Sequence, residues 1–138
     1  MSLDDWVDLP PWLSAPANAV LDDLQRGEPV PGVTLRVNEE DGMDGPVLGL
    51  FEPDGSGGGR LVSRSLDPVD LLLCVAEILQ DELMETSVAW GQSRPPCPHH
   101  PHPARPSVHD GEAWWECPHR SERLYRIGGV ERSATSSA

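Results

Sequence analysis

Lysine is absent from this chain of 138 residues, and tyrosine and phenylalanine occur once each. All ten basic residues are therefore arginines, and the 23 acidic residues give a formal net charge of −13 at pH 7. No apolar run approaches the roughly 20 residues that a membrane-spanning helix needs, so we expect no membrane span. The N-terminus lacks the basic start and apolar core of a secretory signal, which predicts a cytoplasmic location.

Cysteine is also scarce, with only Cys74, Cys97 and Cys117 present. Three cysteines without a secretory signal argue against a disulfide framework. Cys97 and Cys117 each precede a proline and have histidines close by, whereas Cys74 stands alone among acidic residues of a helical pattern. Acidic neighbours raise the pKa of a thiol, so we predict no reactive nucleophile at Cys74. The other two cysteines are candidates for metal binding.

The charge is unevenly distributed along the chain. Residues 1–96 hold 18 acidic residues and five arginines, whereas residues 97–138 hold five of each. An acidic body repels phosphate backbones, so nucleic-acid binding through it is disfavoured. The C-terminal part remains open to a local basic patch, formed by Arg105, Arg120, Arg123, Arg126 and Arg132.

The first ninety residues predict a small α+β body. A short helix is expected over 14–27, with Trp6 and Trp12 docked nearby. Alternating apolar residues from Val33 to Val37 predict a strand, 47–51 a return strand and 60–65 a third short strand. The glycine-rich stretch 55–59 lacks the Gly-Lys-Ser/Thr ending of a phosphate loop, and we interpret it as a flexible turn.

The clearest helix is predicted over 67–90. Asp67 suits the N-cap, Pro68 the first helical position, and Gly91 follows the expected end at Trp90. At about 100° per residue its apolar side chains cover a wide arc, which we expect to pack across the sheet. That arc consists of Leu71, Leu72, Val75, Ala76, Ile78, Leu79 and Leu83.

These patterns predict a fold class and a division of the chain. The fold class is α+β, a small antiparallel sheet packed on one long helix, followed by a zinc-ribbon-like β-hairpin. The predicted segments are an acidic N-terminal part with a short helix (1–29), the hairpin and helix body (30–92), the zinc-ribbon-like module (93–129) and a disordered tail (130–138).

The candidate metal ligands lie in the stretch PPCPHHPHPARP and in WWECPH. Zinc prefers four tetrahedral ligands drawn from thiolate and imidazole. Cys97 and His100 have the C-x2-H spacing of a knuckle, and His102 points to the same side if the chain is extended. Cys117 returns after a loop, at the end of a strand-like segment. The sequence therefore predicts a closed, structural Zn²⁺ site formed by Cys97, His100, His102 and Cys117.

Rival ligands remain open at this point. His99 could replace His100, because only one of them easily shares the turn with Cys97, and His119 could replace His102. His109 lies in a polar stretch and is the weakest candidate. A Pro/His-rich linker that binds metal loosely is the simpler alternative. No H-E-x-x-H helix or deaminase motif is present, so a structural metal is favoured over a catalytic one.

The C-terminal half resembles a family. It is similar to a group of small uncharacterised actinobacterial proteins with a zinc-ribbon-like C-terminal segment, in which a CPxH…HP segment is followed by WxCP and IG. The matching residues are Cys97, Pro98, His100, His102, Pro103, Trp115, Cys117, Pro118, Ile127 and Gly128. The spacing between His100 and His102 is shorter than is usual in that group. The resemblance supports the zinc-ribbon-like interpretation and implies no activity.

We expect a non-enzymatic zinc-binding interaction or adaptor protein, with zinc as a structural staple and the acidic face as the surface for a protein partner. A nucleic-acid-associated regulatory protein that uses the arginines of the zinc module is the second hypothesis. A small zinc metalloenzyme is the third and least favoured, because no acid/base motif accompanies the candidate ligands.

Overall fold

Two helices and six strands form along residues 5–129, the part of the chain that this computed structural model describes. The predicted disordered tail lies outside the described residues. In chain order the elements are α1 (Pro11–Leu24), β1 (Thr34–Asn38), β2 (Val47–Phe51), β3 (Gly57–Leu61), α2 (Pro68–Met84), β4 (Arg105–His109), β5 (Glu112–Cys117) and β6 (Glu122–Arg126). The predicted α+β class is confirmed.

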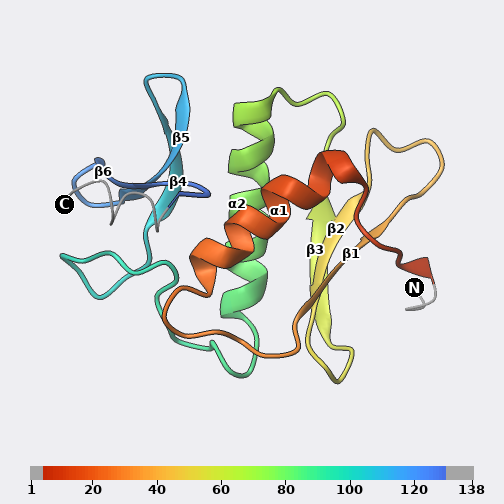
Figure 1. The fold of residues 1–138 in the computed structure, drawn as a ribbon, viewed down its shortest axis with the longest axis horizontal. Helices are drawn as coiled ribbons and strands as arrows, with labels where there is room; N and C mark the ends of the chain where they lie inside the picture. The colour runs from red at the N-terminus through yellow and green to blue at the C-terminus, as the bar shows by residue number, and fades with distance from the viewer. Residues whose placement is uncertain (1–4, 130–138) are drawn as a thin grey trace.

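The strands form two separate antiparallel sheets, with the orders β1-β2-β3 and β4-β5-β6. Helix α2 lies between them, and α1 crosses over α2 (Figure 1). The buried apolar residues of both sheets and both helices belong to one hydrophobic cluster. In the part of the chain described, no helix combines the length and apolarity needed to cross a bilayer.

Helix α2 begins as the sequence predicts and ends earlier. The Asp67 carboxylate accepts a hydrogen bond from the Asp70 N–H at 2.8 Å, and Pro68 follows as the first helical residue. The helix ends at Met84 instead of Trp90. The buried Thr86 hydroxyl donates to the Leu83 carbonyl at 2.7 Å and accepts from the Ala89 N–H, so its side chain replaces the bonds that a continued helix would make.

The body sheet packs its central strand against α2. Leu48 and Leu50 on β2 are almost fully buried, and β2 contacts α2. On the other face, the ring of Trp6 packs edge-on against Phe51 with centroids 4.9 Å apart. A Cβ atom at Gly49 would lie 2.8 Å from the Trp6 ring, so glycine is required beneath it. The predicted docking of Trp6 is confirmed.

The glycine-rich stretch 55–59 is a turn only at its first two residues, and its interpretation as a turn was wrong for Gly57 to Gly59, which belong to β3. Residues Gly57–Leu61 pair with β2 in antiparallel register. A Cβ atom at Gly57 would lie 2.0 Å from the Leu50 carbonyl oxygen, and one at Gly59 would lie 2.0 Å from that of Leu48. Glycine is needed here because the strand approaches its neighbour closely, a property that composition does not reveal.

The C-terminal sheet contains the predicted strands β5 and β6, and also β4, which was expected to be loop. Helix α1 starts earlier than predicted, at Pro11, and ends at Leu24.

Trp115 is fully buried, whereas Trp114 lies on the other face of β5 with the Arg123 guanidinium 5.1 Å from its ring centroid. The two tryptophans therefore lie on opposite faces of β5, as neighbouring residues of a strand do.

Candidate metal centre

A closed loop over residues 94–104 carries three of the four candidate ligands. Its two ends meet through an isolated bridge between Pro96 and Pro103, and the Ala104 N–H donates to the Pro95 carbonyl at 2.9 Å. Within the loop, the Cys97 N–H donates to the His102 carbonyl at 3.2 Å. Prolines restrict the remaining backbone freedom, so the loop is a stiff support for side chains.

The buried side chain of Gln80 ties this loop to α2. Its amide nitrogen donates to the Arg94 carbonyl at 3.0 Å and to the Ala104 carbonyl at 2.6 Å, one at each end of the loop. Without Gln80, both buried carbonyls would lose this hydrogen-bond donor, which costs free energy. Gln80 was not among the predicted residues, although it follows Ala76 by one helical turn and therefore falls on the apolar arc of α2.

The fourth ligand comes from the other side of the site. Cys117 is the last residue of β5 and is fully buried, and the Ser121 N–H donates to its carbonyl at 2.8 Å in a tight turn. Burial disfavours the thiolate, but the backbone N–H groups of Arg120 and His119 donate to the sulfur, and the net effect lowers the pKa of Cys117. Thiolate is the form that binds metal.

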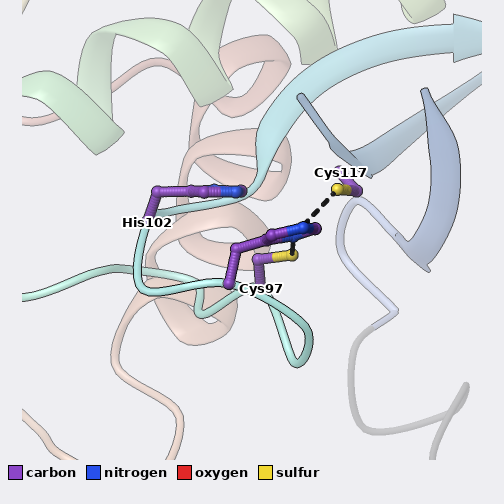
Figure 2. A group of neighbouring side chains, drawn as sticks. Cys97, His102 and Cys117 are labelled. Carbon is purple, nitrogen blue, oxygen red and sulfur yellow. Dashed lines mark hydrogen bonds between the residues drawn. The ribbon is translucent and has the colours of Figure 1, made fainter. Parts of the chain in front are cut away.

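The four candidate ligands meet at one point. One ligand atom each of Cys97, His100, His102 and Cys117 lies within 4.8 Å of all the others, so the group could hold a metal ion. The His100 Nδ1 atom lies 3.5 Å from the Cys97 sulfur and 3.4 Å from the Cys117 sulfur. In Figure 2, the side chains of Cys97, His102 and Cys117 converge from the loop and from the end of β5.

The hydrogen bond of His102 indicates which of its nitrogens faces the site. Its Nδ1 atom lies 3.0 Å from the Pro103 carbonyl, which can only accept, so Nδ1 carries the proton. The Nε2 atom is then an acceptor, and it is buried without a hydrogen-bond partner among the described residues. A buried lone pair with no donor is costly unless a cation occupies the space before it. Metal-binding histidines typically have this arrangement.

The other histidines lie around or away from this group. His99 is exposed, with its ring centroid 6.3 Å from that of His100. His119 is also exposed, yet its ring centroid lies 4.6 Å from that of His102 and 5.0 Å from that of His100. His109 is on β4, where its Nε2 atom lies 2.7 Å from the buried Glu116 carboxylate. The four-residue group contains none of these three.

The pKa is lowered at His100 and raised at Cys74. Burial and the neighbouring His102 and His119 lower the pKa of His100, which favours the neutral imidazole that metals bind. Burial raises the pKa of the Cys74 thiol, and the charge of Glu77 raises it further. The direction predicted for Cys74 is confirmed, but burial contributes more than the acidic neighbour does.

Two buried polar residues join the C-terminal part of the chain to α1. Neither was predicted from the sequence. The Asp23 carboxylate on α1 accepts from the Trp115 indole N–H at 2.9 Å and from the Gly128 N–H at 2.6 Å. The Arg94 guanidinium donates to the carbonyls of Leu24 and Glu28 at the end of α1. These contacts span 66 to 105 positions of the chain, so no local pattern predicts them.

Comparison of the chain with protein-family models, with curated proteins and with solved structures found no match.

Proposed function

We propose that this chain is a non-enzymatic interaction protein in which a structural zinc ion fastens the C-terminal sheet to the loop 94–104. The observation that carries the zinc assignment is the spacing of the ligand atoms. A tetrahedral ion with Zn–S near 2.3 Å and Zn–N near 2.0–2.1 Å separates sulfur and nitrogen by about 3.5 Å. The two sulfur–nitrogen distances to His100 are 3.5 and 3.4 Å.

The chemistry of the four donors supports a structural ion. Two thiolates and two imidazoles complete a tetrahedral zinc site, which leaves no open position for a substrate. Cys97 and Cys117 are buried. The Glu116 carboxylate next to Cys117 is also buried, and it already pairs with Arg105 and His109. Glu116 is therefore not available as a general base. This favours an adaptor over a metalloenzyme.

The nucleic-acid hypothesis is weakened by the pairing of three of the five arginines on which it rests. Arg105 pairs with Glu116 at 2.6 Å, Arg123 with Asp110 at 3.2 Å and Arg126 with Glu112 at 3.0 Å. Each pair cancels a charge that a phosphate contact would need. The acidic excess of residues 1–96 supports a protein partner with basic groups instead.

Metal analysis by native mass spectrometry tests the zinc assignment. The purified chain should carry one zinc ion, and Cys97→Ser or Cys117→Ser should lose it because each removes a thiolate. Cys74→Ser is the matched control and should keep the metal, since Cys74 lies outside the group. A folded, metal-free wild-type protein would overturn the assignment, as would equal zinc loss in all three variants.

Affinity capture from a lysate of the source organism tests the interaction part. A protein partner released by moderate salt is expected if the acidic surface binds it. Recovery of nucleic acid that salt releases would favour the regulatory hypothesis instead.

A further inference from the structure

An open apolar groove of about 760 Å³ lies between α1 and the start of α2. Trp12 and Pro16 of α1 line one side, and Leu71 and Leu72 of α2 line the other. The residues that follow β6 close one end. There, a Cβ atom at Gly128 would lie 3.3 Å from the Ala19 side chain, so the C-terminal turn packs tightly on α1.

The start of α2 has apolar surface that the described residues leave uncovered. Leu71, Leu72 and Leu73 are consecutive, so they point in three directions around the helix, and each is only partly buried. A helix that is apolar all round is normally buried on all sides. Trp12, beside them across the groove, is 37% exposed. The groove therefore leaves apolar surface open where a partner would cover it.

The charges around the groove indicate the kind of partner. Asp67 and Asp70 are exposed at the first turn of α2, next to the lining residues in sequence, and Asp22 is exposed one turn after Ala19 on α1. The cation at the groove, Arg64, is paired with Glu39. The surroundings are thus acidic. Two copies of a chain with net charge −13 repel each other, which disfavours self-association through this face.

We propose that this groove binds a basic amphipathic helix of a partner protein. The apolar stripe of that helix would lie against Trp12, Leu71 and Leu72, and its flanking Lys or Arg residues would face Asp22 and Asp70. Helix-in-groove recognition uses apolar anchors at positions i, i+3, i+4 and i+7, which match a groove between two helices. The proposal rests on the proposed function, an interaction protein with an acidic surface, and it names the site and the partner.

Model peptides with the zinc-loaded full chain provide the test. The probe is a peptide of about 18 residues, five helical turns, with Leu at i, i+3, i+4 and i+7 and Lys elsewhere. One comparison peptide replaces every Lys by Glu, and a second contains the first probe's residues in an order without an apolar stripe. Fluorescence anisotropy measures each affinity. The Leu/Lys helix should bind, and both comparison peptides should bind about tenfold more weakly or worse.

Variants of the protein locate the binding. Leu72→Asp should weaken binding about tenfold or more because it places a charge on the groove wall. Trp12→Ala, which disturbs only a partly exposed side chain, should weaken it in the same direction. Asp70→Asn should reduce both affinity and salt dependence. Val108→Asp is the matched control, since Val108 is 53% exposed on β4 and does not line the groove, and binding should be unchanged.

Three results would overturn the proposal. Unchanged affinity in both Leu72→Asp and Trp12→Ala would mean that the peptide binds elsewhere, and the interaction function would still stand on another surface. A homodimer in ultracentrifugation that Leu72→Asp dissociates would make a second copy the occupant. An apolar small molecule retained in native mass spectrometry and lost in Leu72→Asp would make the groove a ligand pocket. Absence of zinc from the wild type, by contrast, contradicts the zinc assignment alone, and the peptides are then measured against the full chain as purified.

Discussion

The two sheets on either side of α2 are held by different forces. The body sheet buries aliphatic residues such as Leu48, Leu50 and Val37 against the helix. The C-terminal sheet buries Trp115 and Ala113, but also the charged Glu116 and the thiol of Cys117. Apolar burial dominates the first sheet, whereas the second also buries paired polar groups and the candidate ligand Cys117. We therefore expect the C-terminal sheet to depend more on a bound metal than the body sheet does.

Metal removal should change the stability of the two sheets most unequally. Zinc at about 1,000 times its dissociation constant contributes about 4 kcal/mol, which corresponds to roughly 15 °C in melting temperature for a domain of this size. We expect chelation to lower the melting temperature by that order. Hydrogen exchange should lose protection over 94–127, while α2 and the body sheet keep theirs. Equal loss of protection in both sheets would contradict the difference between them.

Leu48→Ala should destabilise the body without reaching the metal. Leu48 is fully buried on β2, and such a truncation costs about 2–5 kcal/mol of unfolding free energy through lost contacts and a cavity. Urea denaturation measures this loss. Zinc stoichiometry should stay at that of the wild type, because Leu48 lies outside the group of ligands. Loss of zinc in the folded variant would show that the two regions are not separable.

Asp23→Ala should weaken the joint between the regions. It leaves the buried indole N–H of Trp115 and the N–H of Gly128 without their acceptor, at about 1–3 kcal/mol for an unsatisfied group. The expected result is lower stability and a second transition in calorimetry, as the C-terminal sheet begins to unfold separately. The exposed Asp22→Ala is the matched control. A single transition at the wild-type temperature would mean that Asp23 does not join the regions.

Gln80→Leu should lower stability through two buried carbonyls left without their donor, and it should also weaken metal binding specifically. The substitution keeps the volume nearly constant but removes the donor to both ends of the loop 94–104. Loss of a group that hydrogen-bonds a ligand reduces metal affinity about 10–100-fold, and Gln80, which contacts the loop ends and no ligand, should have an effect at the low end of that range. Competition with a chelator measures the affinity, and Thr86→Val controls for loss of a buried hydrogen bond elsewhere. Equal affinity in wild type and Gln80→Leu would contradict a positioning role for Gln80.

Local rules predicted the elements whose causes are local. The Asp67 cap and Pro68 start α2, and alternation along β5 places Trp114 and Trp115 on opposite faces. The C-x2-H spacing and the return of Cys117 predict the same four candidate ligands that the structure brings together. The errors had two causes. Thr86 ends α2 early through a side-chain hydrogen bond to Leu83, three residues back, which apolar periodicity does not reveal. The glycines of β3 form a strand because the distant strand β2 lies against them.

The sequence by itself determined the fold class, the capped central helix and the residue types of a thiolate–imidazole site, because these depend on composition and short spacings. Only the tertiary structure decided which His102 nitrogen faces the site and where the apolar groove lies. It also decided that Gln80 holds the loop 94–104 and that Asp23 holds the C-terminal sheet. The physical reason is that buried polar groups must find partners wherever the chain brings them. For Asp23 and Gly128 that partner is 105 positions away.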